Sequence, residues 1–313
     1  MIISASRRTD IPAYYADWFF DRLREGYVLI RNPMNPRRIA RVPLTPDVVD
    51  GIVFWTKNPL PLLDRLDEIK DYPYYFQFTL NPYGIEIEPG VPPKDKTIVP
   101  TFLRLSDRIG ADRVLWRYDP ILLSPTYPPQ YHLEAFARLA KCLSGYTRVC
   151  TFSFVDLYRH LGDTARNLGL LPISIPQMRA LAAGFSDIAQ TYGIQLFTCA
   201  ENLDLSQVGI LPARCIDGRL FEQMCNCHLN LKKDTNQRAE CNCDASIDIG
   251  SYDSCVAGCR YCYANIHPGA AAGNRIKHDA HSPLLLGTIG PEDVVYDRPV
   301  HSCRENQLRL SDI

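Results

Sequence analysis

The 313-residue sequence lacks several features that would assign a location or a ligand at once. No apolar run approaches the roughly 20 residues that a membrane helix needs. The first residues, "MIISASRRTDIP", lack the basic and then apolar layout of a signal peptide, so we expect a cytoplasmic protein without a membrane partner. The net charge is only −1, which argues against bulk electrostatic attraction to nucleic acid, although a local basic patch would still allow it.

The sequence also lacks a G-x-G-x-x-G segment and a P-loop, the glycine-rich patterns that cradle phosphates. Short apolar segments alternate with amphipathic helical segments, which predicts a parallel sheet covered by helices. The seven predicted strands are "IISAS", "IVFWTKN", "YYFQFTLN", "RVLWRYDP", "CTFSFVD", "IQLFTCAE" and "SIDIGSY". Seven such units without a phosphate loop favour a TIM-like (β/α) barrel of about seven parallel strands over an open sheet. The segments "VLIRNP" and "RIARVPL" predict a two-stranded insertion.

Each predicted strand ends in polar residues. In a parallel barrel all these ends meet at one mouth, where barrel enzymes place their chemistry. The candidate catalytic or substrate-binding residues are Lys57, Asn58, Arg117, Asp119, Asp156, Cys199, Glu201 and Cys215. Lys57 is costly to bury unpaired, so Asp119, Asp156 or Glu201 is its expected partner. Two alternatives stay open: the polar ends are ordinary turns, and Arg117 with Asp119 forms an internal salt bridge.

Cysteine is scarce in the first two thirds of the chain and abundant afterwards. Only Cys142 and Cys150 precede residue 199, and nine of the other ten cysteines lie between Cys199 and Cys262. In a reducing cytosol, such clustering favours metal binding or catalysis over disulfide bonds.

The stretch "SYDSCVAGCRYCYAN" places Cys255, Cys259 and Cys262 directly after the last predicted strand. Structural zinc normally takes four protein ligands. Three thiolates can instead hold three irons of a cubane iron–sulfur cluster and leave the fourth iron open to a small molecule. A zinc site with His267 as the fourth ligand is the alternative.

Two closely spaced cysteine pairs predict a second metal site, either structural zinc or a fully ligated iron–sulfur cluster. These residues are Cys225, Cys227, Cys241 and Cys243. We expect them near the bottom of the barrel, and two alternatives stay open: a quartet that includes Cys199 or Cys215, and reduced thiols packed as small apolar groups. His278 and His281 could chelate a metal or lie in a solvated loop.

The C-x3-C-x2-C spacing with Tyr261 before the third cysteine resembles the cluster motif of the radical S-adenosylmethionine superfamily. "GCRYCYAN" is similar to the form found in the spore photoproduct lyase branch. This resemblance implies a [4Fe-4S] cluster, S-adenosylmethionine chelated to its open iron, reductive cleavage of that cofactor to a 5′-deoxyadenosyl radical, and an electron donor such as flavodoxin or ferredoxin. The cofactor carries the radical chemistry and the protein positions it.

The position of the cysteine loop departs from that superfamily, in which the loop usually follows the first strand. A closed barrel would place the last strand beside the first, as a circular permutation. The expected cofactor-binding residues are then Ser6, Arg7, Arg8, Asp10 and Tyr261. One of the arginines would pair with the cofactor carboxylate, and Asp10 would accept from its ammonium group. A helix start with Thr9 or Asp10 as its cap is an alternative that does not consume the arginines.

Nearly the whole chain also resembles a bacterial family catalogued as domain of unknown function 1848. Matching stretches include "IISASRRTDIPAYY", "VFWTKNPLP", "WRYDPI", "TFSFVDLY", "KKDTNQRAECNCDASIDIGSYDSC" and "GCRYCYAN". That family has a C-terminal cysteine cluster similar to the N-terminal one of radical S-adenosylmethionine enzymes, and the resemblance transfers no substrate.

We therefore predict a radical S-adenosylmethionine-type enzyme that acts on a small-molecule or unknown substrate. Residues 1–252 would form the barrel, with a cysteine-rich segment at 199–243. Residues 253–313 would form the cluster loop and an extension that packs on the mouth. Two competing hypotheses are a non-catalytic iron–sulfur or zinc protein and a nucleic-acid repair enzyme of the photoproduct lyase type.

Overall fold

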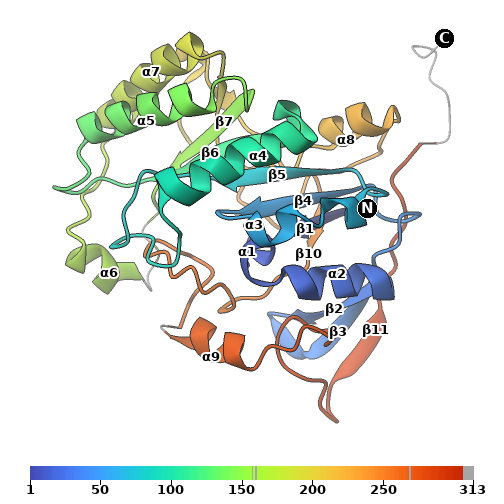
Figure 1. Ribbon diagram of the computed structural model, residues 1–313. Helices are drawn as coiled ribbons and strands as arrows, with labels where there is room; N and C mark the ends of the chain where they lie inside the picture. Colours follow the sequence, from blue (N-terminus) through green and yellow to red (C-terminus); the bar gives the residue numbers. More distant parts are fainter. Residues whose placement is uncertain (157, 159–160, 268, 306–313) are drawn as a thin grey trace.

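The computed structural model describes residues 1–156, 158, 161–267 and 269–305, and its centre is a parallel sheet (Figure 1). This sheet has eight strands in the order β10-β1-β4-β5-β6-β7-β8-β9, and each neighbouring pair is parallel. The strands are β1 (Ile2–Ala5), β4 (Gly51–Thr56), β5 (Tyr74–Thr79), β6 (Val114–Ile121), β7 (Val149–Phe154), β8 (Gln195–Thr198), β9 (Leu211–Pro212) and β10 (Ser246–Asp248). The seven predicted strands are all present, and the short β9 is an addition.

At one end of the sheet, β10 pairs with β1, and Ile3 lies opposite Ile247. The predicted neighbourhood of the last and first strands is therefore confirmed. Between β9 and β10 the described residues show no strand pairing, so closure into a TIM-like barrel is not shown. The chain crosses this gap as irregular backbone and one helix, α8 (Gly218–Cys225). The confirmed fold is thus an α/β protein with a large parallel sheet.

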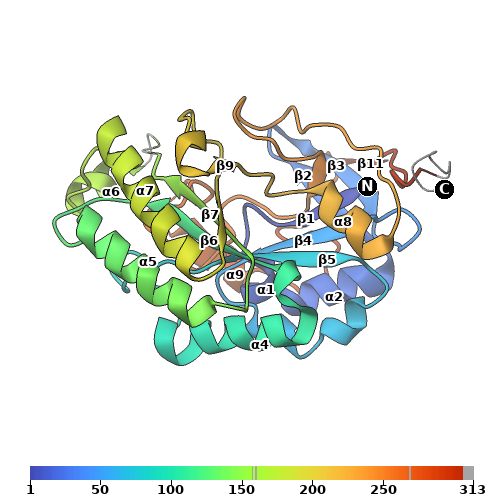
Figure 2. The ribbon, with the colours of Figure 1, turned by 90° about the horizontal axis from the view of Figure 1, so that it is seen from above.

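Helices α2, α4, α5 and α7 lie along one side of the sheet (Figure 2). The helices on the described chain before β8 are α1 (Ile11–Tyr14), α2 (Ala16–Glu25), α3 (Leu60–Leu63), α4 (Val99–Ile109), α5 (Pro129–Leu143), α6 (Gly162–Asn167) and α7 (Ile175–Thr191). Their apolar side chains pack against alternate strand residues, as with Phe19 on Phe54 and Phe136 on Trp116. In the described part of the chain, no helix is both long and apolar enough to cross a bilayer.

The other side of the sheet is covered by the segment that contains β9 and α8 (Figure 2). Strand side chains alternate in direction, so the neighbours of Phe54 and Phe76 face this side. Val53 and Tyr75 accordingly belong to a second apolar cluster, together with Phe221 of α8. The predicted cysteine-rich segment therefore crosses the sheet face that the helices leave uncovered.

A smaller sheet contains the predicted two-stranded insertion. β2 (Tyr27–Asn32) and β3 (Asn35–Pro43) pair antiparallel, and β11 (Val294–Asp297) pairs parallel with β3. Within residues 253–305, Asn274 of α9 (Ala270–Ile276) donates to the carbonyl of Asp253 at 2.9 Å, so α9 contacts the start of the cysteine loop. The later part of this segment includes β11, which pairs with the edge of β3.

The contact between β10 and β1 depends on the lack of a side chain at Gly250. A Cβ there would lie 2.1 Å from the Ser6 hydroxyl oxygen and 2.7 Å from that of Thr9. We expect Gly250→Ala to lower the free energy of unfolding by about 1–3 kcal/mol, the usual cost of an overpacked contact. Urea unfolding midpoints measure it. Gly273→Ala in α9 is the control, since nothing lies within 4 Å of the added methyl group. Equal midpoints for Gly250→Ala and the parent protein would contradict this account of the contact.

Candidate functional site

A cavity of about 510 Å³ opens at the carboxyl ends of the parallel strands. Its wall includes residues that directly follow β1, β4, β7 and β8 and residues in the second half of β6, which is where the sequence placed a functional mouth. Seven cysteines line it: Cys199, Cys215, Cys241, Cys243, Cys255, Cys259 and Cys262. The fold therefore brings cysteines from four separate chain segments to one space.

The three cysteines of the C-x3-C-x2-C motif are half-buried and face this cavity. Backbone N–H groups of Asp10 and Ala257 donate to the sulfur of Cys255, and two further N–H groups donate to that of Cys262. Hydrogen bonds of this kind stabilise thiolates in iron–sulfur sites. Burial raises the pKa of Cys255 to about 12.

The cysteine loop is fixed to its surroundings by close backbone contacts. The N–H of Gly90 donates to the carbonyl of Ala257 at 2.9 Å, and a Cβ on Gly90 would lie 2.8 Å from the Ala257 Cα. The hydroxyl of Tyr263 donates to the carbonyl of Arg7 at 2.7 Å. The loop thus contacts both the segment after β5 and the segment after β1.

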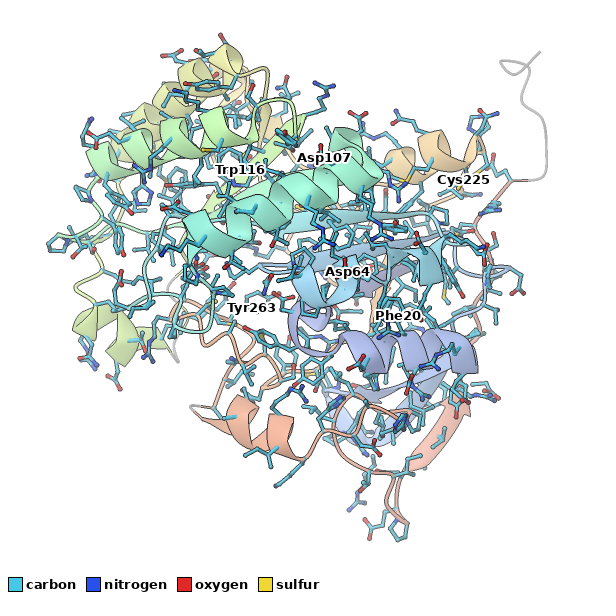
Figure 3. The ribbon with its side chains drawn as sticks, viewed as in Figure 1. Phe20, Asp64, Asp107, Trp116, Cys225 and Tyr263 are labelled. Carbon is cyan, nitrogen blue, oxygen red and sulfur yellow. The ribbon has the colours of Figure 1, made fainter. Side chains whose placement is uncertain are left out.

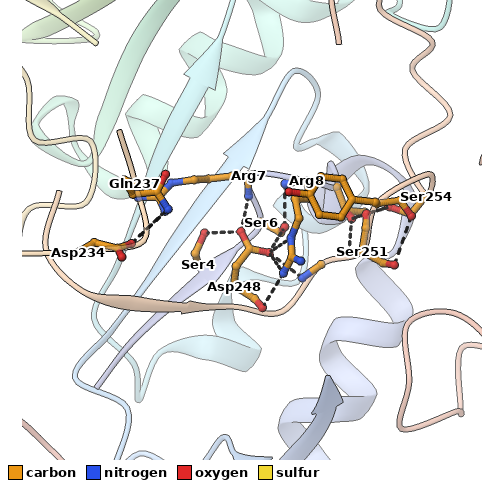
Figure 4. Close-up of polar contacts among 12 residues, drawn as sticks. Ser4, Ser6, Arg7, Arg8, Asp234, Gln237, Asp248, Ser251 and Ser254 are labelled. Carbon is orange, nitrogen blue, oxygen red and sulfur yellow. Dashed lines mark hydrogen bonds and ion pairs between the residues drawn. The ribbon is translucent and has the colours of Figure 1, made fainter. Parts of the chain in front are cut away.

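The seam between β1 and β10 is organised around the carboxylate of Asp248 (Figure 4). This carboxylate accepts from the hydroxyl of Ser6 at 2.5 Å, from the Arg7 N–H at 2.8 Å and from the Arg8 guanidinium at 3.0 Å. Arg8, a predicted cofactor-binding residue, is therefore paired with Asp248. Arg7 also has an ion pair, with its Nη1 3.6 Å from the carboxylate of Asp234. Its Nη2 is buried without a hydrogen-bond partner among the described residues, and Arg7 lines the cavity.

Asp10 is the N-cap of α1, as the alternative interpretation of "RRTD" proposed. Its carboxylate accepts from the N–H of Ala13 at 3.1 Å and from that of Lys57 at 2.7 Å. Burial raises the pKa of Asp10 to about 6. Asp10 also lines the cavity, so its cap role and its place in the site coexist.

Lys57 pairs with an acid that the sequence did not single out. Its ammonium group lies 2.8 Å from the carboxylate of Glu88 and donates to the hydroxyl of Tyr261 at 2.8 Å. Lys94 contacts the other oxygen of Glu88. Burial favours the neutral carboxyl group, but the two ammonium groups outweigh it and lower the pKa of Glu88 to about 2.

The expected partners of Lys57 were Asp119, Asp156 and Glu201, and this expectation is corrected by the contacts. Glu88 lies in the irregular segment after β5, within "GIEIEPG", where no strand or helix pattern marks it. The only sequence signal for Glu88 was Lys57, because a buried lysine requires a nearby acid.

Arg117 and Asp119 form the internal salt bridge that was one of two alternatives. Nε of Arg117 donates to the Asp119 carboxylate at 3.0 Å, and Nη1 lies 3.0 Å from the sulfur of Cys215. Burial raises the pKa of Asp119, but the guanidinium outweighs it, and the net pKa is lowered. Both residues line the cavity, so the pair forms a charged part of its wall.

Of the predicted quartet of Cys225, Cys227, Cys241 and Cys243, two members lie at the cavity, and Cys227 packs against the same apolar cluster as they do. Cys241 and Cys243 line the cavity, whereas Cys225 ends α8 and lies 3.9 Å from Nη2 of Arg304. In Figure 3, Cys225 and Tyr263 of the cysteine loop lie on opposite sides of the view. The chain turns after Cys225 at Asn226, which has a φ of 48°, and then returns to the carboxyl ends of the strands. The quartet predicted from the two C-x-C units did not take this return of the chain into account.

The remaining predicted mouth residues have local partners. Asn58 accepts from the N–H of Leu60 at 3.3 Å, as at a helix start. Asp156 pairs with Arg238 at 2.5 Å on the cavity wall. Glu201 accepts from the N–H of Phe154 at 2.8 Å, and burial raises the pKa of Glu201 to about 7.

The three histidines that were alternative metal ligands each contact a different group. Nδ1 of His267 lies 2.7 Å from Asp253, Nδ1 of His281 lies 2.6 Å from Asp21, and His278 donates to a carbonyl. Over residues 1–156, 158, 161–267 and 269–305, no group of three or more His, Cys, Asp or Glu side chains is arranged to hold one metal ion.

Fold and site together define an α/β protein whose parallel sheet carries a cysteine-lined cavity at its carboxyl edge. Residues 2–264 match the family model described as "Domain of unknown function (DUF1848)", and the chain belongs to this family. The match includes the parallel sheet and all seven cysteines of the cavity. No curated protein matches the sequence.

Proposed function

We propose that this protein is a radical S-adenosylmethionine-type enzyme whose [4Fe-4S] cluster is held by Cys255, Cys259 and Cys262. The observation that carries the proposal is the convergence of these three motif cysteines on one cavity at the strand ends. A cubane cluster separates its thiolates, because each binds a different iron, so a three-cysteine site of this kind need not resemble a single-ion site. The backbone N–H groups on Cys255 and Cys262 suit such a cluster.

When bound, the cluster and S-adenosylmethionine supply one-electron cleavage of the cofactor and a radical that attacks the substrate. The chain contributes binding and orientation. We assign the cofactor carboxylate to Arg7, because Arg8 is paired with Asp248 and Nη2 of Arg7 lacks a partner among the described side chains. A buried guanidinium donor without a partner is costly, and a carboxylate satisfies it with two parallel hydrogen bonds.

The size and polarity of the cavity support a small-molecule ligand. A volume of about 510 Å³ lies within the usual range for small-molecule pockets. The wall combines the indole of Trp55 with the charged groups of Lys57, Arg117 and Asp119. Lys57 is held as a cation by Glu88, which also positions the Tyr261 hydroxyl directly before the third cysteine. An electron donor such as flavodoxin or ferredoxin is part of the proposal.

The decisive experiment is anaerobic reconstitution with iron and sulfide, followed by dithionite and S-adenosylmethionine. We expect 5′-deoxyadenosine to form, and we expect the cofactor to change the EPR spectrum of the reduced cluster because it binds the open iron. Omitting dithionite is the control and should stop product formation. The proposal is wrong if the reconstituted iron–sulfur protein forms no 5′-deoxyadenosine and its EPR spectrum does not change when S-adenosylmethionine is added.

A further inference from the structure

Four cysteines outside the C-x3-C-x2-C motif also gather at the cavity. They come from the end of β8, the segment after β9 and the loop before β10, and they form the four-cysteine cluster Cys199, Cys215, Cys241 and Cys243. The sulfurs of Cys199 and Cys215 are 3.6 Å apart. Cys215 also contacts Cys243, and Cys243 contacts Cys241, so the four sulfurs follow one another in a row.

The backbone that carries this cluster is held by buried side chains of the sheet. The carbonyl of Cys215 accepts from the hydroxyl of Tyr75 at 2.9 Å and from the amide of Gln77 at 2.7 Å. Both residues belong to β5 and are fully buried. The position of Cys215 is therefore set by side chains of the central strand β5.

A second set of contacts joins the Cys215 segment to the Cys243 segment. The N–H of Asp244 donates to the carbonyl of Ile216 at 3.0 Å, and the N–H of Ile216 lies 3.4 Å from the sulfur of Cys243. The N–H of Gly218 also donates to the carboxylate of Asp244 at 2.7 Å, so the two segments pack closely. Two chain regions 28 positions apart are thus fixed in the arrangement that brings their sulfurs together.

Cationic and donor groups surround the four-cysteine cluster. Nη1 of Arg117 lies 3.0 Å from the Cys215 sulfur, and the side chain of Arg117 is only 4% exposed. The guanidinium of Arg7 lies over the ring of Trp55, and so does that of Arg117. Nε1 of Trp55 is buried without a hydrogen-bond partner in the part of the chain that the structure describes. A buried donor of this kind indicates that an acceptor or an anion belongs beside it.

We propose that Cys199, Cys215, Cys241 and Cys243 hold a second iron–sulfur cluster, with thiolates at all of its protein ligand positions. A single zinc ion would bring all four sulfurs into mutual contact at the corners of one tetrahedron. A row of sulfurs in contact suits a two-iron cluster, in which Cys199 and Cys215 would bind one iron, Cys241 and Cys243 would bind the other, and sulfide would join the two irons. A cluster with four thiolates is an anion, so the nearby guanidinium groups stabilise it. This inference does not rest on the proposed function, because it concerns different ligands.

The test measures iron and acid-labile sulfide in full-length variants after the same anaerobic reconstitution. The variant Cys255→Ala/Cys259→Ala/Cys262→Ala should keep about one third of the iron and sulfide of the parent protein, because the second cluster would hold about two of six irons. The variant Cys215→Ser/Cys243→Ser should lose about that third and keep the rest. Cys225→Ser/Cys227→Ser is the matched control and should keep all of it. In the triple alanine variant, the EPR signal of the reduced cluster should not change when S-adenosylmethionine is added, because thiolates already bind every iron and none is open to the cofactor.

Three results would overturn the second cluster: loss of all iron in the triple alanine variant, undiminished iron in Cys215→Ser/Cys243→Ser, or zinc without sulfide at this site. Circular dichroism and elution volume show whether each variant folds, and the single variant Cys199→Ser replaces the double variant if that one does not. Failure of the proposed function is distinguishable, since it shows as a parent protein without 5′-deoxyadenosine formation whatever its iron content.

Discussion

Replacing Cys259 with alanine is expected to abolish formation of 5′-deoxyadenosine in the reconstituted, reduced protein. Cys259 is the middle cysteine of the motif, and its loss leaves two thiolates for a cluster that needs three from this loop. Changes to groups outside the ligand shell of metal sites already cost about 10–100-fold, so we expect a loss greater than about 100-fold for a ligand. The measurement is 5′-deoxyadenosine per chain, together with the cofactor-dependent EPR signal.

Cys142→Ala is the matched control for this variant, because Cys142 is exposed on α5 and lies outside the cavity. It should behave as the parent protein does in both measurements. Should Cys259→Ala retain the cofactor-dependent signal and the product, Cys259 is not a ligand and the proposed three-cysteine site is wrong. Iron that remains without that signal fits the second cluster instead.

Glu88→Gln should be among the most destabilising single substitutions in the chain. The carboxylate of Glu88 is fully buried between Lys57 and Lys94, whose side chains are 15% and 18% exposed. Removing the charge leaves two poorly solvated ammonium groups beside each other. Breaking a buried ion pair from one side costs about 3–5 kcal/mol, and the partial exposure of the lysines places our expectation near the lower value. Urea unfolding with linear extrapolation measures the change.

Glu292→Gln makes the same chemical change in a solvent-exposed ion pair. Glu292 and its partner Arg37 are each 73% exposed, so the expected change in unfolding free energy is at most about 1 kcal/mol. If both variants lose the same small amount, the network around Glu88 contributes nothing beyond an ordinary surface pair. The expected difference between the two is about 2 kcal/mol or more.

Strand order was predictable because continuous apolar segments with polar ends are what a parallel sheet requires. The sequence also predicted that "SIDIGSY" lies beside "IISAS", because a closed barrel places its last strand next to its first, and the two strands do pair. Closure of the sheet into a barrel did not follow from that pattern. The two-residue β9 and the irregular chain after it have no periodic pattern, so the sequence could not show that the pairing between β9 and β10 would be missing from the described chain.

Within the site, the cysteine loop was predictable because its ligands are adjacent in sequence and their spacing is specific. For the other cysteines, the sequence offered a quartet that includes Cys199 or Cys215 only as an alternative, since these two residues are separated from Cys243 by α8 and by a turn back to the mouth. Glu88 was missed for a similar reason: its role depends on Lys57 and Lys94, which approach it only in three dimensions. Sequence spacing identifies ligands that share a loop, and folding decides which loops share a cavity.

The pairing of β10 with β1 also has a consequence for the order of events during synthesis. The ribosome releases β1 first and the cysteine loop about 250 residues later, so the cavity lacks one wall until most of the chain exists. Until then, the edge of β1 that β10 will cover is free to pair with another chain. Insertion of the proposed cluster at Cys255, Cys259 and Cys262 would therefore be a late step, and we expect chains that stop before Ser246 to aggregate, which pelleting of the truncated chain measures.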